Sequence, residues 1–124
     1  MISIHQFVAG FGPGDAISNE AMVFRRFFRS RGFAAEIFTE PRRVLPELRH
    51  EVRDLAQAGQ GLQPGDIALL HLSTGSIVND AFAALPCRKA LLYHNITPPE
   101  YFRGFQEEIA CNLAKGREQA SRLA

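Results

Sequence analysis

Apolar and polar residues follow two periods along this chain, one typical of strands and one typical of helices. Short runs rich in isoleucine, leucine, valine and alanine predict four strands, at residues 2–8, 35–38, 67–72 and 89–94. The run at 67–72 lacks the alternation of a half-exposed strand, so we expect it to be covered on both faces.

Helical spacing predicts a first helix over residues 16–31. Asp15 is a good N-cap for it, and Gly32 supplies the left-handed conformation that ends many helices. We expect its apolar stripe to lie in the core, with the members Ala21, Val23, Phe24, Phe27 and Phe28. Further helices are predicted over 46–57, beginning at Pro46, over 77–85, and from 99 to the end with a break near Gly104.

Strand and helix therefore alternate four times along the chain. This order predicts one α/β domain over residues 1–124, with a parallel sheet and helices on both faces. Ligands bind such sheets at the carboxyl ends of the strands. The loops that follow the strands are therefore the predicted place of the site.

A glycine-rich turn follows the first predicted strand. Gly10, Gly12 and Gly14, with Pro13 between the last two, precede Asp15 and the first helix. Glycine lets the backbone approach a ligand closely, and the first turn of a helix presents N–H groups and a partial positive charge. This combination predicts an anion site, most often for phosphate.

Small polar residues follow the other strands, and a parallel sheet brings these positions to one edge. They are Thr39 and Glu40, the loop Ser73, Thr74, Gly75 and Ser76, and the segment His94, Asn95, Ile96 and Thr97.

A dinucleotide-binding fingerprint fits the glycine turn only in part. Glu40 stands where a ribose-binding acid would lie, but Asp15 replaces the third glycine and would repel a pyrophosphate. No Gly-Lys-Ser/Thr follows the turn, which excludes a Walker loop. Ser73 and Ser76 lack the Gly-x-Ser-x-Gly elbow of a nucleophilic serine.

The histidines allow two interpretations. His94 ends a strand at the ligand edge, where it can hydrogen-bond a sugar hydroxyl, transfer a proton, or merely cap the strand. His5 and His71 lie within strands, and we expect packing roles for them. The spacing of Cys87 and Cys111 predicts neither a metal site nor a disulfide framework.

Composition narrows the class of protein. The chain has 124 residues, 46% of them hydrophobic, and a net charge of +1, which gives no strong attraction to nucleic acid. We expect the arginine clusters at 25–31 and 42–43 to be solvated. No apolar run approaches the roughly 20 residues needed to cross a bilayer, and no basic segment opens the chain as in a signal peptide. We expect a soluble cytoplasmic protein.

Three segments occur in the order GPGDAISN at 12–19, LHLSTGS at 70–76 and YHNITPPEYF at 93–102. Together they resemble the amino-terminal domain of the family-4 retaining glycosyltransferases, which have two Rossmann-like domains in the GT-B arrangement. The last segment is the most specific, because its proline pair and aromatic residues follow a histidine at a strand end.

This resemblance implies an acceptor-side domain of an enzyme that transfers a sugar from a nucleotide-diphosphate-sugar donor to a carbohydrate acceptor. Gly12, Pro13, Gly14 and Asp15 would lie against the donor diphosphate, and His94 would be the catalytic residue near the transferred sugar. The acceptor side would include Ser73, Thr74, Gly75, Ser76, Asn95 and Thr97. Such enzymes usually need no metal, and no cofactor is implied.

The resemblance further implies that the chain is a partial domain of such an enzyme, without the donor-binding domain. We expect four strands in the order 3-2-1-4, no transferase activity from this chain alone, and self-association through the uncovered edge of the strand at 89–94. Two alternatives remain: a non-catalytic α/β module that binds a nucleotide or phosphate, and a fragment of a dinucleotide-dependent oxidoreductase.

Overall fold

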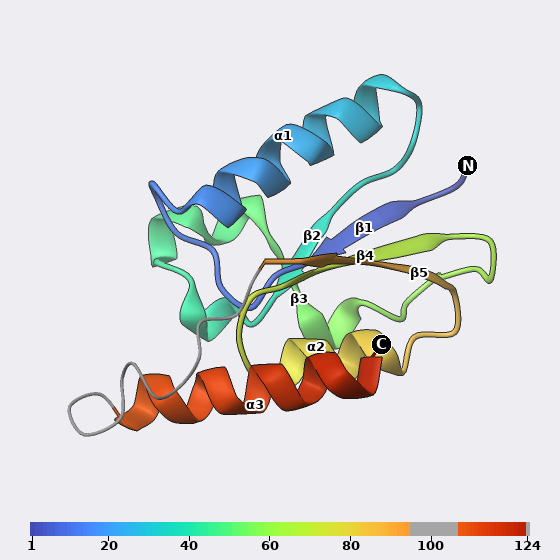
Figure 1. Cartoon of the computed structure of the whole chain (residues 1–124). Coiled ribbons are helices and arrows are strands. Elements are labelled where there is room, and N and C mark those ends of the chain that lie inside the picture. The colour runs from blue at the N-terminus through green and yellow to red at the C-terminus, as the bar shows by residue number, and fades with distance from the viewer. Residues whose placement is uncertain (95–106, 124) are drawn as a thin grey trace.

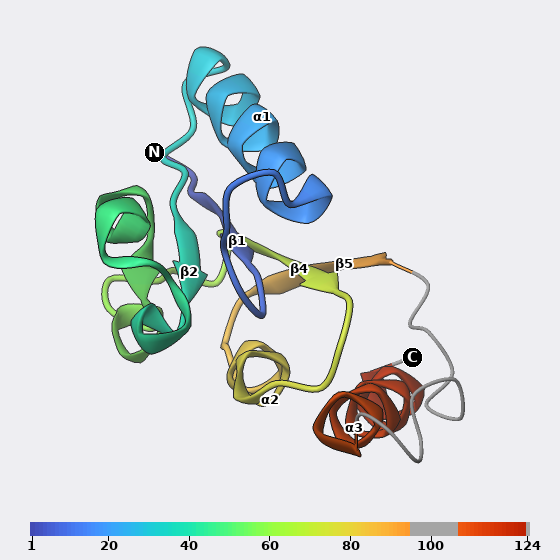
Figure 2. The ribbon, with the colours of Figure 1, turned by 90° about the vertical axis from the view of Figure 1, so that its left-hand side faces the viewer.

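The computed structural model describes residues 1–94 and 107–123. Its centre is a parallel sheet whose five strands lie in the order β3-β2-β1-β4-β5. Helix α1 covers one face of the sheet, and α2 and α3 cover the other (Figures 1 and 2). The strands are β1 Ile4–Phe7, β2 Ile37–Thr39, β3 Arg53–Asp54, β4 Ile67–Leu72 and β5 Arg88–Tyr93; the helices are α1 Ala16–Ser30, α2 Ile77–Ala83 and α3 Glu107–Leu123. The predicted class, a parallel α/β sheet with helices on both faces, is confirmed.

The predicted strand order 3-2-1-4 is wrong for two strands. It put the strand at 67–72 beside the strand at 35–38 and the strand at 89–94 beside the strand at 2–8, whereas β4 pairs with β1 over Ile67–Leu70 and β5 pairs with β4 over its whole length. The place beside β2 is taken by β3, which the sequence did not predict. The observed order matches the first five strands of the doubly wound order 3-2-1-4-5-6.

The missed strand lies inside the segment that was predicted as a helix over 46–57. This segment instead forms the 3₁₀ helices Pro46–Glu51 and Leu55–Gln57 on either side of β3. Val52 is 9% exposed and packs in the apolar cluster beneath α1, and Ala58 packs in the cluster on the other face. The segment thus contributes to both apolar clusters, with β3 between Val52 and Ala58 in the sequence.

Helix α1 begins and ends as predicted. Asp15 accepts a 2.9 Å hydrogen bond from the Ser18 amide, and Gly32 follows the helix with a φ of 90°. The predicted apolar stripe is only partly buried, however, because Val23 and Phe27 are more than half exposed. The helix contacts the sheet instead through a narrow face of small and polar residues around Ala21.

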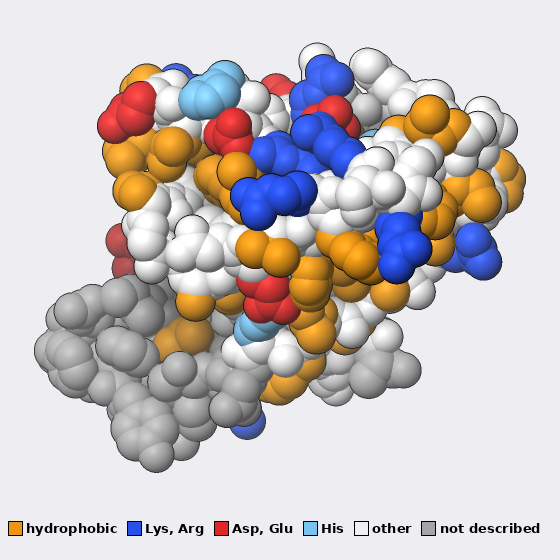
Figure 3. All heavy atoms as spheres, turned by 90° about the horizontal axis from the view of Figure 1, so that it is seen from above, with side chains coloured by type: hydrophobic (Ala, Val, Ile, Leu, Met, Phe, Trp, Pro, Cys, Tyr) orange, Lys and Arg blue, Asp and Glu red, His pale blue; other side chains and the backbone are white. Residues whose placement is uncertain are grey.

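The arginines of α1 are mostly exposed, as expected, but Arg25 is not. It is 9% exposed and binds the Glu51 carboxylate at 2.6 Å, which ties α1 to the segment before β3. Figure 3 looks onto the side of the molecule that carries α1 and shows basic side chains interspersed with hydrophobic ones.

Two apolar clusters hold the sheet between its helices. The first packs against α2 and α3, and the second lies beneath α1. The members of the first include Phe7, Phe38, Leu70, Leu72, Val78, Phe82 and Leu113; those of the second include Val8, Phe11, Ala21, Ile37, Val44 and Val52. Val8 and Phe11 of the second cluster anchor the loop after β1 beneath α1.

Helix α3 is fixed to the loop after β4 by a buried glutamine. Gln119 is 2% exposed, and its side chain bonds both the amide and the carbonyl of Ser76 and the side chain of Asn79. The predicted helix from 99 to the end is confirmed from Glu107 onward. Gly104, Asn95 and Thr97 lie outside the described residues.

Strand β5 forms one edge of the sheet, as expected for the strand at 89–94. Leu91 is 41% exposed and Tyr93 is 48% exposed. No helix in the described part of the chain is long and apolar enough to span a membrane.

Candidate functional site

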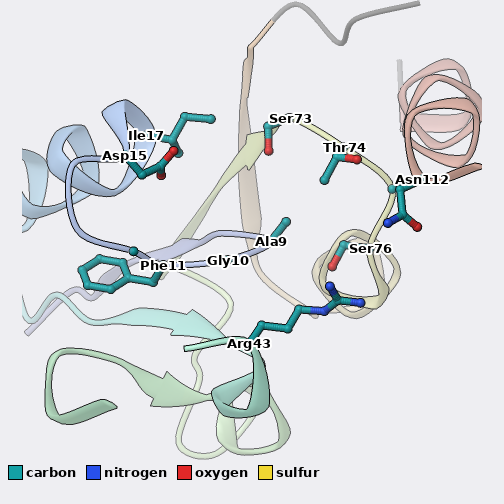
Figure 4. Close-up of a pocket in the computed structure, with 12 residues that line it drawn as sticks. Ala9, Gly10, Phe11, Asp15, Ile17, Arg43, Ser73, Thr74, Ser76 and Asn112 are labelled. Atoms are coloured by element: carbon teal, nitrogen blue, oxygen red, sulfur yellow. The ribbon is translucent and has the colours of Figure 1, made fainter. Parts of the chain in front are cut away.

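A cavity of about 430 Å³ opens at the carboxyl ends of β1 and β4 (Figure 4). It lies between the glycine turn and the loop after β4, and Arg43 and α3 complete its wall. The lining residues are Ala9, Gly10, Phe11, Gly12, Asp15, Ile17, Arg43, Ser73, Thr74, Gly75, Ser76 and Asn112. Six predicted site residues therefore come together here: Gly12, Asp15, Ser73, Thr74, Gly75 and Ser76.

The glycine turn is closed by its own hydrogen bonds. The Gly12 amide donates to the Ser18 hydroxyl at 3.1 Å, and this hydroxyl donates to the Asp15 carboxylate at 2.7 Å. The Gly12 amide therefore already has a partner within the turn. Pro13 and Gly14 are exposed and do not line the cavity. Gly14 has a φ of 72°, a conformation that favours glycine.

Asp15 is the N-cap of α1. Its carboxylate accepts from both the amide and the hydroxyl of Ser18, so its charge is partly compensated within the turn. The carboxylate still lies at the rim of the cavity (Figure 4).

The loop after β4 forms the opposite wall, where Ser73 and Thr74 lie across the cavity from Phe11 and Asp15 (Figure 4). Two of its polar groups serve the fold: the Gly75 amide donates to the Asn112 carbonyl at 2.8 Å, and the Ser76 hydroxyl accepts from the Val78 amide at 3.1 Å. The half-buried hydroxyls of Ser73 and Thr74 are the polar side chains that this loop offers to a ligand.

Arg43 supplies the positive charge of the cavity. It lies in the 3₁₀ helix Pro41–Arg43, directly after β2, and its guanidinium extends toward Ser76 and Asn112 (Figure 4). An ion pair of 3.2 Å with Glu40 steadies this side chain, which is 48% exposed. This exposure agrees with the expectation that the arginines at 42–43 are solvated, and Arg43 lines the cavity as well.

Glu40 does not take part in the cavity. Its carboxylate is held by Arg42 at 2.9 Å and by Arg43 at 3.2 Å, and its side chain is 8% exposed. It lines a separate, mostly apolar groove with Ile77 and Ala81. A ribose held by Glu40 would therefore lie outside the cavity that the glycine turn forms.

His94 is not among the cavity residues. It follows β5, its amide donates to the Leu72 carbonyl at 2.8 Å, and its ring is half-buried. Its Nε2 lies 3.0 Å from Nδ1 of His71, which is 1% exposed. Burial, and to a smaller extent His94, lowers the pKa of His71 to about 4.

His5 on β1 serves the fold. His5 accepts a hydrogen bond from the Glu36 amide through Nδ1, and burial lowers its pKa. Within residues 1–94 and 107–123, no group of three or more histidine, cysteine or acidic side chains is placed to hold a metal ion.

Comparison of the chain with protein-family models, with curated proteins and with solved structures finds no match in any of the three.

Proposed function

We propose that this chain is the acceptor-side part of a retaining glycosyltransferase, and that its cavity receives the diphosphate of a nucleotide-sugar donor. The observation that carries the proposal is the cavity itself. It joins the glycine turn to the loop after β4 at the carboxyl edge of a parallel sheet, and it contains Arg43. The three sequence segments that resemble family-4 glycosyltransferases favour this function among those that such an edge can perform.

In this proposal Arg43 neutralises the leaving diphosphate, because guanidinium groups bind phosphate oxygens through paired hydrogen bonds. Ser73 and Thr74 hydrogen-bond hydroxyl groups of the substrates. His94, at the end of β5, lies near the transferred sugar. We propose that the reaction needs no metal or cofactor, and that the donor nucleotide is held mainly by a second domain.

The first alternative is a non-catalytic module that binds a nucleotide or phosphate through the same cavity. It differs from a transferase in one respect: the sugar of the ligand would add nothing to binding. The second alternative, a dinucleotide-dependent oxidoreductase, needs an acid that can reach a ribose beside the glycine turn. Glu40 is paired with two arginines and faces another groove, which favours the transferase.

The partners proposed are a nucleotide sugar and a carbohydrate acceptor, not nucleic acid, because the net charge is only +1. A cytoplasmic location agrees with the two cysteines, both of which are free. We also propose that two copies associate through β5. A two-fold axis at Leu91 would place Lys89 of one copy beside Tyr93 of the other, which keeps the basic residues of the two strands apart.

The proposal is tested by isothermal titration of the chain with a nucleoside diphosphate and with the corresponding nucleotide sugars. Arg43→Ala should weaken binding about tenfold or more, since a charge-assisted hydrogen bond contributes about 1.5–3 kcal/mol. Arg42→Ala is the matched control, because Arg42 also binds Glu40 but does not line the cavity. Equal loss in both variants, or no binding by the wild type, would contradict the proposal.

Two further arms separate the alternatives. If the nucleotide sugar binds no better than the nucleoside diphosphate, the module is favoured. Binding of a nicotinamide or flavin dinucleotide that is lost in Glu40→Gln would instead identify the oxidoreductase. A full-length parent, given nucleotide sugars and a panel of acceptors, should transfer the sugar, whereas this chain alone should not.

A further inference from the structure

A line of buried polar groups crosses the face of the sheet beneath α1. Gln6 on β1 donates from Nε2 to the Ala21 carbonyl at 2.9 Å, and its Oε1 lies 2.7 Å from Nε2 of His71 on β4. Nδ1 of His71 lies in turn 3.0 Å from Nε2 of His94, at the end of β5. Gln6 and His71 are 0% and 1% exposed, so water does not compete for the two bonds that Gln6 makes.

The chemistry of the groups gives this line a direction. The Ala21 carbonyl can only accept, so the amide nitrogen of Gln6 faces it and the amide oxygen faces His71. That oxygen also only accepts, so Nε2 of His71 carries the hydrogen. In a neutral His71 the other nitrogen, Nδ1, is then an acceptor, and the hydrogen of the last bond lies on Nε2 of His94.

Two observations support a neutral His71 and a real bond to His94. Burial lowers the pKa of His71 to about 4, so its ring carries one hydrogen at neutral pH. The ring centres of the two histidines are 5.3 Å apart with an interplanar angle of 23°. That separation is close to the sum of the nitrogen–nitrogen distance and the two ring radii, so the two nitrogens lie on the line that joins the ring centres. The rings therefore meet edge to edge and nearly in one plane, which is the geometry of a hydrogen bond between ring nitrogens.

Phe24 holds His71 from the side of the helix. Its ring lies nearly parallel to that of His71, at 28° and 6.0 Å between centres. It packs against the ring without offering a hydrogen-bonding group, so it can fix the ring plane but not the position of the hydrogen.

We infer that Gln6 and His71 are positioning residues that hold His94 with its hydrogen on Nε2, so that Nδ1 is the ring nitrogen of His94 that accepts hydrogen bonds and protons. This inference rests on the proposed function only for its consequence, which is that a sugar hydroxyl donates to Nδ1. A histidine whose acceptor nitrogen is fixed in advance loses no binding free energy in selecting a tautomer.

The direction of the last bond can be measured in the chain without a ligand. In ¹⁵N-histidine-labelled protein at neutral pH, a through-bond ¹H–¹⁵N–¹⁵N experiment detects a ring hydrogen that is shared across a hydrogen bond. We expect a slowly exchanging hydrogen on Nε2 of His94, with a cross-peak to Nδ1 of His71. The reverse pattern, with the hydrogen on Nδ1 of His71, would overturn the inference, and so would the absence of any cross-peak.

A pair of variants then tests the role of Gln6. Gln6→Leu removes the acceptor that orients His71, so we expect loss of the cross-peak and a mixture of tautomers at His94. Phe24→Leu, which alters packing on the same ring, should preserve the cross-peak and the single tautomer of His94. If Gln6→Leu leaves the tautomer of His94 unchanged, Gln6 is not a positioning residue. If that variant does not fold, the wild-type spectrum alone decides the direction.

The two proposals can fail separately. A reversed bond leaves the effect of Arg43→Ala on diphosphate binding untouched. Conversely, a chain that binds no nucleotide sugar still shows the ring hydrogen on one side or the other. If the spectra agree with the inference and a bound sugar leaves the Nδ1 signal of His94 unchanged, only the consequence for the sugar is wrong.

Discussion

Gly75 in the loop after β4 and Gly116 on α3 lie backbone to backbone. A Cβ on Gly75 would come within 2.5 Å of the Asn112 carbonyl oxygen, and one on Gly116 would come within 2.6 Å of the Gly75 nitrogen. This contact, together with Gln119, sets the position of the loop that forms one wall of the candidate site. Helix α3 thus fixes the position of one wall of the cavity.

Gly116→Ala should therefore destabilise the fold, by about 1–3 kcal/mol as overpacking usually does. The added methyl group meets backbone, which cannot move away as a flexible side chain would. Urea unfolding monitored by circular dichroism measures the change. Gly59→Ala is the control, because a Cβ at that position meets nothing within 4 Å; an equal loss in both variants would refute the account.

The stability of the chain should depend on pH through His71. Above pH about 6.5 the ring is neutral in both the folded and the unfolded state. Between that pH and about 4 the unfolded state binds a proton that the folded state does not, so the free energy of unfolding falls as the pH falls. Below about 4 both states are protonated and this contribution stops changing.

Unfolding measured at several pH values for the wild type and for His71→Asn tests this dependence. His5, whose pKa is also lowered by burial, is present in both proteins, so the difference between the two curves isolates His71. Parallel curves would show that His71 is as accessible to protons in the folded chain as in the unfolded one.

Thr39, at the end of β2, is 0% exposed, and its hydroxyl has no hydrogen-bond partner among the described residues. Thr39→Val keeps the shape and removes the unsatisfied group, so it should stabilise the fold by about 1 kcal/mol. Thr74→Val, in the half-exposed wall of the cavity, should give no such gain. Destabilisation of the Thr39 variant in thermal unfolding would mean that the hydroxyl is bonded in solution.

The proposed pairing of two chains through β5 predicts a concentration-dependent dimer in analytical ultracentrifugation. Leu91→Lys places a charge on the edge strand and should give a monomer. Val23→Lys introduces the same charge at an exposed position on α1 and should leave the dimer intact. A wild-type monomer at every concentration would contradict the pairing.

Local signals predicted much of this fold. Asp15 and Gly32 bound α1 because caps act within one turn, and the apolar runs mark β1, β4 and β5. Strand β3 was missed because its two residues, Arg53 and Asp54, are charged. They form a strand only through their pairing with β2. That pairing is a tertiary effect, and it also explains the error in strand order.

The candidate site was predicted less completely than the fold. Convergence of the glycine turn and the Ser73–Ser76 loop follows from the parallel sheet, so the sequence could indicate it. Arg43 is the last residue of a short 3₁₀ helix that the periodicity of the sequence does not predict, so its place in the cavity could not be predicted either. The bond between His71 and His94 depends on the register of β4 against β5, which the sequence does not display.

We propose that the cavity between the glycine turn and the Ser73–Ser76 loop receives the diphosphate of a nucleotide sugar. The most direct test of this proposal is an amide ¹H–¹⁵N titration of the chain with a nucleotide sugar. We expect the largest shifts on Gly10, Gly12, Arg43 and Ser73 to Ser76. Shifts concentrated instead in the groove around Glu40 and Ile77, or no shifts at saturating ligand, would contradict it.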